Sequence, residues 1–221
     1  MSTLAGIAER LAARGLDLCA PLGLDQYNAA VAPALRWDPF GREDAQALVV
    51  GNTRELWRVL RASPGALLGP NPVDRATEAG VREAMGGLRH AVRFAFEPSP
   101  NLLAAVSAAE VAGLVWRAPC QLGIHPVHGP WLALRALIVL DEPAAARGNP
   151  LQPVCTACDA ACLPALREAM EGAALTHADV RNHWRRWLAV RDACPVGRAS
   201  RYDDAALAYH YTHDPKTLEA T

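Results

Sequence analysis

The chain has 221 residues, of which 51% are hydrophobic and 20% charged, with a formal net charge of -1. This composition excludes a disordered chain and a nucleic-acid binder that depends on bulk positive charge. It suits one large α/β or α+β domain with at most a small appendage.

No stretch approaches the roughly 20 apolar residues that cross a bilayer, and the first residues do not form a signal peptide. We therefore expect a cytoplasmic protein with no membrane partner. Six cysteines are too few for a disulfide scaffold in a chain of this size. Most of them cluster between positions 155 and 194, which points to metal or redox chemistry.

The first half of the chain predicts three helices and a strand. Apolar residues at helical spacing indicate a helix over 4–13. The apolar run 47–50 indicates a buried strand, and Asn52 or Thr53 is expected to cap the helix that follows it. An Asn-Pro start and a Gly-Gly end indicate another helix over 71–85.

The second half centres on one strongly apolar strand. Alternating residues predict a strand over 89–96, and Asn101 is expected to cap a long, buried helix over 102–116. Residues 131–140 are apolar on both faces except for Arg135, which is typical of a central strand. After a linker, further helices are expected over 163–172, 176–191 and 203–211.

A loop rich in glycine and proline, 123–131, precedes the central strand. Its backbone amides, the imidazoles of His125 and His128 and the indole of Trp131 can approach a flat ligand. The alternative is a tight turn whose histidines are solvated or hydrogen-bonded locally. Arg135 cannot stay buried without an anionic partner, which is either an internal carboxylate or a ligand.

Four cysteines have a spacing that suits a metal site. Cys155 and Cys158 form a C-x2-C pair, Cys162 can add a third thiolate and Cys194 can complete a tetrahedral set for zinc or an iron-sulfur cluster. The spacing departs from the usual iron-sulfur run because Gln152 replaces its first cysteine. The alternatives are a reactive or disulfide-forming dithiol and unligated buried thiols. The two other cysteines are expected to be inert core residues: Cys19 and Cys120.

The expected helix over 176–191 has an aromatic face. Trp184, Trp187 and Leu188 fall on one side of it together with Arg191. Such an arginine can hold a carboxylate-rich ligand through two hydrogen bonds, or it can lie in solvent beside Asp192.

Several segments, taken in their order, resemble the CblC-type family, which decyanates and dealkylates incoming cobalamin (vitamin B12). They are CAPLGL at 19–24, NPVD at 71–74, AAEVAG at 108–113, IHPVHGPWLALR at 124–135, HWRRW at 183–187 and RDA at 191–193. The resemblance implies an α+β fold with a flavin-nitroreductase-like central sheet flanked by helices. It places this cobalamin-binding core at 1–145 and a helical, cysteine-containing segment, packed on the core, at 146–221.

The resemblance also implies a binding site and a co-reactant. Such a protein reduces bound cobalamin with a flavin (FMN or FAD) or transfers its upper alkyl group to glutathione. Arg135 and Arg191 take the positions of arginines that hold the carboxylates of glutathione, and Lys216 takes a third basic position. The positions implied to contact cobalamin are Leu103, Ala104, Ala105, Val106, Trp116, Arg117, Gly123, His125 and Leu134.

The chain departs from the family in three ways. Glu110 stands where the family has a histidine, and Trp116, Arg117 and Ala118 replace tyrosines on the flavin side. The cysteine run resembles instead the iron-sulfur segments of epoxyqueuosine reductases and reductive dehalogenases, in which cobalamin is a working cofactor. We expect a cobalamin-binding oxidoreductase or alkyl transferase, monomeric or weakly dimeric. A ferredoxin-like iron-sulfur or zinc protein and a flavin enzyme without cobalamin are the alternatives.

Overall fold

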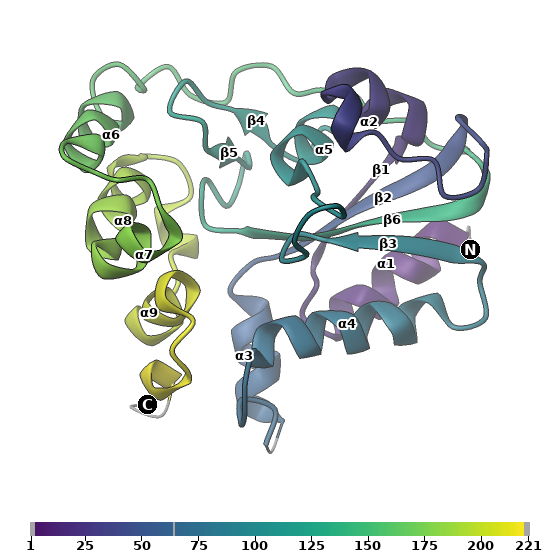
Figure 1. Ribbon diagram of the computed structural model, residues 1–221, viewed down its shortest axis with the longest axis horizontal. Coiled ribbons are helices and arrows are strands. Elements are labelled where there is room, and N and C mark those ends of the chain that lie inside the picture. Colours follow the sequence, from purple (N-terminus) through teal and green to yellow (C-terminus); the bar gives the residue numbers. More distant parts are fainter. Residues whose placement is uncertain (1–2, 64, 219–221) are drawn as a thin grey trace.

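The computed structural model describes residues 3–63 and 65–218. A four-stranded antiparallel sheet lies at its centre, in the order β1-β2-β6-β3 (Figure 1). The strands are β1 (Leu18–Gly23), β2 (Ala45–Asn52), β3 (His90–Phe94) and β6 (Ala133–Pro143). Because β6 lies between β2 and β3, the predicted central strand is confirmed, as is the α+β class.

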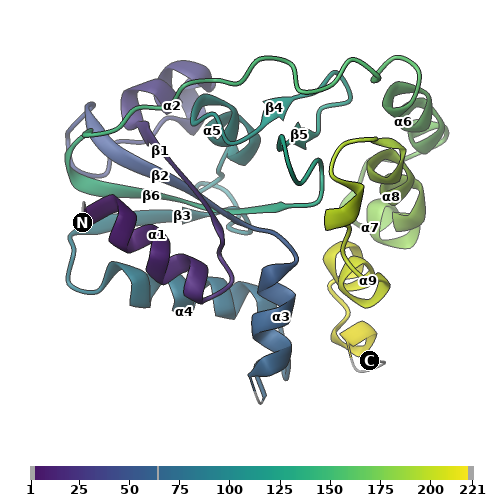
Figure 2. The same cartoon turned by 180° about the vertical axis from the view of Figure 1, so that it is seen from behind.

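Helices cover both faces of the sheet (Figure 2). One face carries α1 (Thr3–Ala13) and α4 (Pro72–Met85), and the other carries α2 (Leu24–Ala30) and α5 (Ala105–Val111). In β2, Leu48 and Val50 pack on the first side and Ala47 and Val49 on the second. Successive side chains of a strand point to opposite faces, so a strand that is covered twice is apolar throughout.

The C-terminal helices stand at one end of the sheet. These C-terminal helices are α6 (Cys162–Met170), α7 (His177–Asn182), α8 (Trp184–Ala193) and α9 (Asp204–Thr212). The helix that follows β2 is α3 (Glu55–Ala62). One apolar cluster joins α3 to α8 and α9, and in it the rings of Trp57 and Tyr209 meet edge to face at 5.7 Å. None of the described helices is long and apolar enough to cross a membrane.

The predicted long helix over 102–116 is wrong. Only Ala105–Val111 is helical, and Asn101 does not cap it because Ala104 precedes its first residue. Gly113, with a φ of 74°, turns the chain away, and a Cβ there would lie 2.2 Å from the carbonyl oxygen of Asn149 in the linker. The chain continues into a small two-stranded sheet of β4 (Trp116–Arg117) and β5 (Gly123–Ile124). Long-range packing of the linker therefore ends a helix that the local pattern would extend.

Two other local predictions need correction. The helix expected over 176–191 is divided into α7 and α8 at His183, whose φ of -116° and ψ of 28° are not helical. Arg54, not Asn52 or Thr53, is the capping residue of α3, although the Thr53 hydroxyl accepts a 3.3 Å hydrogen bond from the Glu55 amide. In addition, the sequence analysis does not predict strand β1, whose proline is accommodated because the strand lies at the sheet edge.

The loop 123–131 is fixed by close contact between two backbones. His125 and Gly129 pair with each other through hydrogen bonds of 2.9 and 2.8 Å. Gly129 has a φ of 58°, and a Cβ on it would lie 2.0 Å from the carbonyl oxygen of Val196. A Cβ on Gly197 would in turn lie 2.1 Å from the carbonyl carbon of His128. The entry to β6 and the turn after α8 therefore hold each other in place.

This contact predicts unequal effects of two glycine substitutions. Gly41 has a similar φ of 65° but open space around it. We expect G41A to lose about 1–2 kcal/mol of unfolding free energy through backbone strain alone. G129A should lose about 1–3 kcal/mol more because of the overlap with Val196. Urea unfolding measures both, and equal losses would contradict the proposed contact.

Candidate functional site

A cavity of about 910 Å³ opens between the sheet and the C-terminal helices. This volume is near the upper end of the roughly 300–1,000 Å³ typical of small-molecule sites. Its lining comes from α4, α5, the segments before and after α5, β6, α7, α8 and α9. The site therefore draws on both the sheet and the C-terminal segment.

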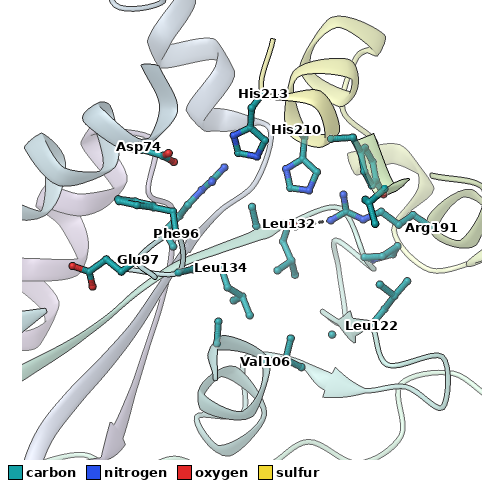
Figure 3. Close-up of a pocket in the computed structure, with 18 of the residues that line it drawn as sticks. Asp74, Phe96, Glu97, Val106, Leu122, Leu132, Leu134, Arg191, His210 and His213 are labelled. Carbon is teal, nitrogen blue, oxygen red and sulfur yellow. Dashed lines mark hydrogen bonds between the residues drawn. The ribbon is translucent and has the colours of Figure 1, made fainter. Parts of the chain in front are cut away.

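One part of the cavity is apolar. Val106 of α5 and Leu122 lie on one side, and Leu132 and Leu134 lie near the centre of the view (Figure 3). Leu122 also packs against a buried cluster of cysteines behind it. These side chains offer an apolar surface to the cavity.

The opposite part carries charge. Figure 3 shows Asp74, His210, His213 and Arg191 together at this wall. Burial raises the pKa of Asp74, and the positive charges of Arg135 and His213 act against that rise. The sequence motifs had indicated Arg135 and Arg191 but had not assigned Asp74 or either histidine to the site.

Arg135 lines the cavity from the central strand. Its Nε donates a 2.6 Å hydrogen bond to Oδ1 of Asn52 on β2, a neutral group. Within residues 3–63 and 65–218 no carboxylate lies within 4 Å of this guanidinium, although Asp74 lines the same cavity. The internal carboxylate that burial seemed to require is thus nearby but not in contact.

Arg191 is buried, with 8% of its surface exposed. Its Nη2 donates a 2.8 Å hydrogen bond to the Leu132 carbonyl, whereas its buried Nη1 has no partner in the part of the chain that the structure describes. Asp192 pairs instead with Arg201 at 2.8 Å. The alternative of a solvated Arg191 beside Asp192 is therefore wrong, and an unsatisfied donor is left at the cavity wall.

His210 lines the charged wall of the cavity from α9. Burial lowers its pKa well below the ordinary value, and the charges of Arg191 and Arg135 lower it further. Its imidazole is therefore neutral near pH 7. In the sequence, the only signal that could have indicated His210 was the recurrence of polar residues within an otherwise apolar helix.

The positions implied to bind cobalamin divide into two groups. Ala105, Val106, Gly123 and Leu134 line the cavity, together with both arginines. The others lie outside its lining: Leu103, Ala104, Trp116, Arg117 and His125. Lys216, the third basic position implied for the co-reactant, also lies outside it.

The implied positions outside the lining have local partners. Leu103 and Ala104 pack on the sheet core, and Trp116 packs on the cysteine cluster. Arg117 pairs with Glu110 at 3.0 Å and donates to the Ser107 hydroxyl. Lys216 is exposed.

His125 has the local role that the turn alternative predicts. Its Nδ1 accepts hydrogen bonds from the amides of Val127 at 3.1 Å and His128 at 3.2 Å. Burial lowers the pKa of His125 to about 4, with a smaller contribution from His128. A proton on Nδ1 would remove both hydrogen bonds, so the loop depends on a neutral ring.

Acid should therefore weaken the fold through His125. In the unfolded chain His125 binds a proton below the ordinary histidine pKa of about 6.5. In the folded protein its ring does not bind that proton until about pH 4. The folded state therefore loses stability as the pH falls from about 6.5 to about 4. H125N keeps a hydrogen-bond acceptor near the position of Nδ1. We expect its melting temperature to fall less than that of the wild type between pH 6.5 and 4.5. H183N, at an exposed histidine, should keep the wild-type slope. Parallel slopes for all three proteins, measured by circular dichroism, would refute this role.

The cysteines gather in a second buried cluster. Cys120, Cys158, Cys162 and Cys194 pack together with the first turns of α6 and the end of α8, and Cys155 lies beside them. All are free thiols. Cys120, which the sequence suggested to be an inert core residue, belongs to this cluster.

The thiols of this cluster are not arranged as metal ligands. Burial raises the pKa of Cys162 to about 12, and the neighbouring thiols add to that rise. Metal-binding cysteines are deprotonated. Among the described residues, no group of three or more His, Cys, Asp or Glu side chains is placed to hold a metal ion.

The fold and the site define an α+β protein with a large ligand cavity between an antiparallel sheet and a C-terminal helical segment. No protein-family model and no curated protein matches the chain. Among solved structures, the chain is similar to CblC, a B12-trafficking protein of C. elegans and homologue of human MMACHC. The TM-score is 0.68 at 14% identity, over 98% of this chain and 94% of that one.

The chain is also similar to an epoxyqueuosine reductase. The TM-score is 0.51 at 14% identity, over 95% of this chain and 68% of that one. At such identities the likeness concerns the fold. The CblC-type fold that the ordered segments predicted is confirmed.

Proposed function

We propose that the cavity binds cobalamin and that the protein processes it as a substrate, by reductive decyanation or by dealkylation. The observation that carries this proposal is a cavity of about 910 Å³ in a fold like that of a B12-trafficking protein. Ala105, Val106, Gly123 and Leu134, which the family resemblance implies as cobalamin contacts, all line it.

The residues present fit the ligand. Cobalamin has a broad, mostly apolar ring with a fringe of amides, and it suits a cavity with apolar walls and polar groups at one side. Val106 and Leu122 would hold one part of the ring, with Leu134 against another. When bound, cobalamin supplies the electron and alkyl chemistry at its cobalt. The protein's task is to bind, orient and shield it from water.

A co-reactant is required, and the charged wall favours an anionic thiol such as glutathione. Arg135 and Arg191 both line the cavity, and neither has a carboxylate partner within the described chain. Guanidinium groups with free N–H donors bind carboxylates strongly in an enclosed site. A flavin is the alternative reductant, and it would need the same wall to face its phosphate groups.

Filling the cavity should weaken cobalamin binding. We expect L122W to weaken hydroxocobalamin binding at least about tenfold, because the larger ring occupies space that the ligand needs. L68W is the matched control, since Leu68 is 72% exposed and lies outside the cavity lining. The shift of the cobalamin absorption spectrum measures the affinity. If the wild type does not bind, or L122W binds as well as L68W, the proposed function fails.

We propose a metal site as a second function, with Cys155, Cys158, Cys162 and Cys194 holding an iron-sulfur cluster or zinc. The observation that favours it is the meeting of these thiols from the linker, α6 and the end of α8 in one cluster. As they stand, the thiols do not form a metal site, so they would have to lose protons and rearrange.

Metal analysis decides this second function. We expect anaerobically purified wild type to contain iron or zinc, and C194S to lose it. C19S is the control, because Cys19 lies on β1 outside the cluster. Wild-type protein with neither metal would remove the proposal.

A further inference from the structure

His210 lies on α9 in the charged wall of the cavity, close to His213 and Arg191 (Figure 3). Its ring meets the Tyr211 ring edge to face at 5.2 Å. No residue in the ranges 3–63 and 65–218 forms a hydrogen bond with its imidazole. The imidazole therefore lines the cavity without a hydrogen-bond partner among the described residues.

The charge around His210 is mostly positive. The titratable groups that line the cavity with it are Asp74 (α4), Glu97 (between β3 and α5), Arg135 (β6), Arg181 (α7), Arg191 (α8), Tyr211 (α9) and His213. The carboxylic acids among these lining residues are Asp74 and Glu97. Burial, then Arg191, Arg135 and His213, lower the pKa of His210 in that order. A further proton here would add a positive charge beside two guanidinium groups in an enclosed space.

We propose that His210 accepts the thiol proton of the co-reactant, and that the carboxylates of the same co-reactant enable it to do so by neutralising Arg135 and Arg191. This inference rests on the proposed function, because it assumes that an anionic thiol enters the cavity. It adds the residue that converts the thiol into a thiolate.

The step follows from electrostatics. In the empty cavity burial, and after it the charges of Arg191 and Arg135, lower the pKa of His210. Bound carboxylates offset those charges and so remove that part of the lowering, while the part caused by burial remains. A thiol has an ordinary pKa of about 8.5. Its S–H bond breaks and an N–H bond forms on His210, giving a thiolate and an imidazolium that stabilise each other. No electrons are transferred in this step.

Proton uptake tests the coupling without cobalamin. We expect S-methylglutathione, which has no thiol proton, to bind the wild type at pH 6 with net proton uptake, because its carboxylates offset the arginine charges that lower the pKa of His210. Calorimetry in two buffers of different ionisation enthalpy measures the uptake. H210Q should lose it, whereas H183Q, at an exposed histidine outside the cavity lining, should keep it. Equal uptake by wild type and H210Q, or no binding of S-methylglutathione, overturns the inference.

A second measurement tests the proton acceptor itself. Labelled glutathione should show a thiol pKa at least about one unit lower when it is bound to the wild type than when it is bound to H210Q. This difference corresponds to about tenfold more thiolate on the wild type at pH 7. If H210Q does not fold, the wild-type affinity for S-methylglutathione must still rise as the pH falls from 8 to 5, and a flat profile overturns the inference. Because none of these assays contains cobalamin, a failure here is distinct from a failure of the L122W assay.

Discussion

The site depends on one buried interaction, the hydrogen bond from Arg135 on the central strand to Asn52 on its neighbour, at 2.6 Å. A neutral amide orients this guanidinium without cancelling its charge. Asn52 is itself fixed, because its side chain donates to the Thr53 carbonyl and its carbonyl accepts from the Tyr202 hydroxyl. The network thus joins β2, β6 and the segment before α9. It leaves one positive charge directed at a cavity instead of at an internal acid.

The cavity exists because two parts of the chain meet. The sheet supplies Arg135 and the apolar floor, while the C-terminal helices supply Arg191 and His210. The close backbone contact around Gly129 holds the two parts in register. Leu122 belongs both to the cavity wall and to the packing around the cysteines, so the cavity and the cysteine cluster are neighbours.

The elements with a strong local period could be predicted, and those decided by distant contacts could not. Helix α4 and strands β2 and β6 carry their burial pattern in consecutive residues, and each forms where it was expected. Helix α5 is shorter because the linker packs against Gly113, and β1 forms in spite of Pro21 because it pairs on one side only. A run of apolar residues records that a segment is buried but not which partner ends it.

For the site, the sequence by itself showed which charged residues would be costly to bury. It also showed an order of segments that resembles CblC. It identified Arg135 as a charge in need of a partner. Only the tertiary structure decided which groups share the cavity: it directs His125 into its own turn, buries Arg191 away from Asp192 and brings His210 to the wall. The reason is physical. Hydrophobic period is a local property, whereas the potential at a titratable group sums charges that are distant in sequence and close in space.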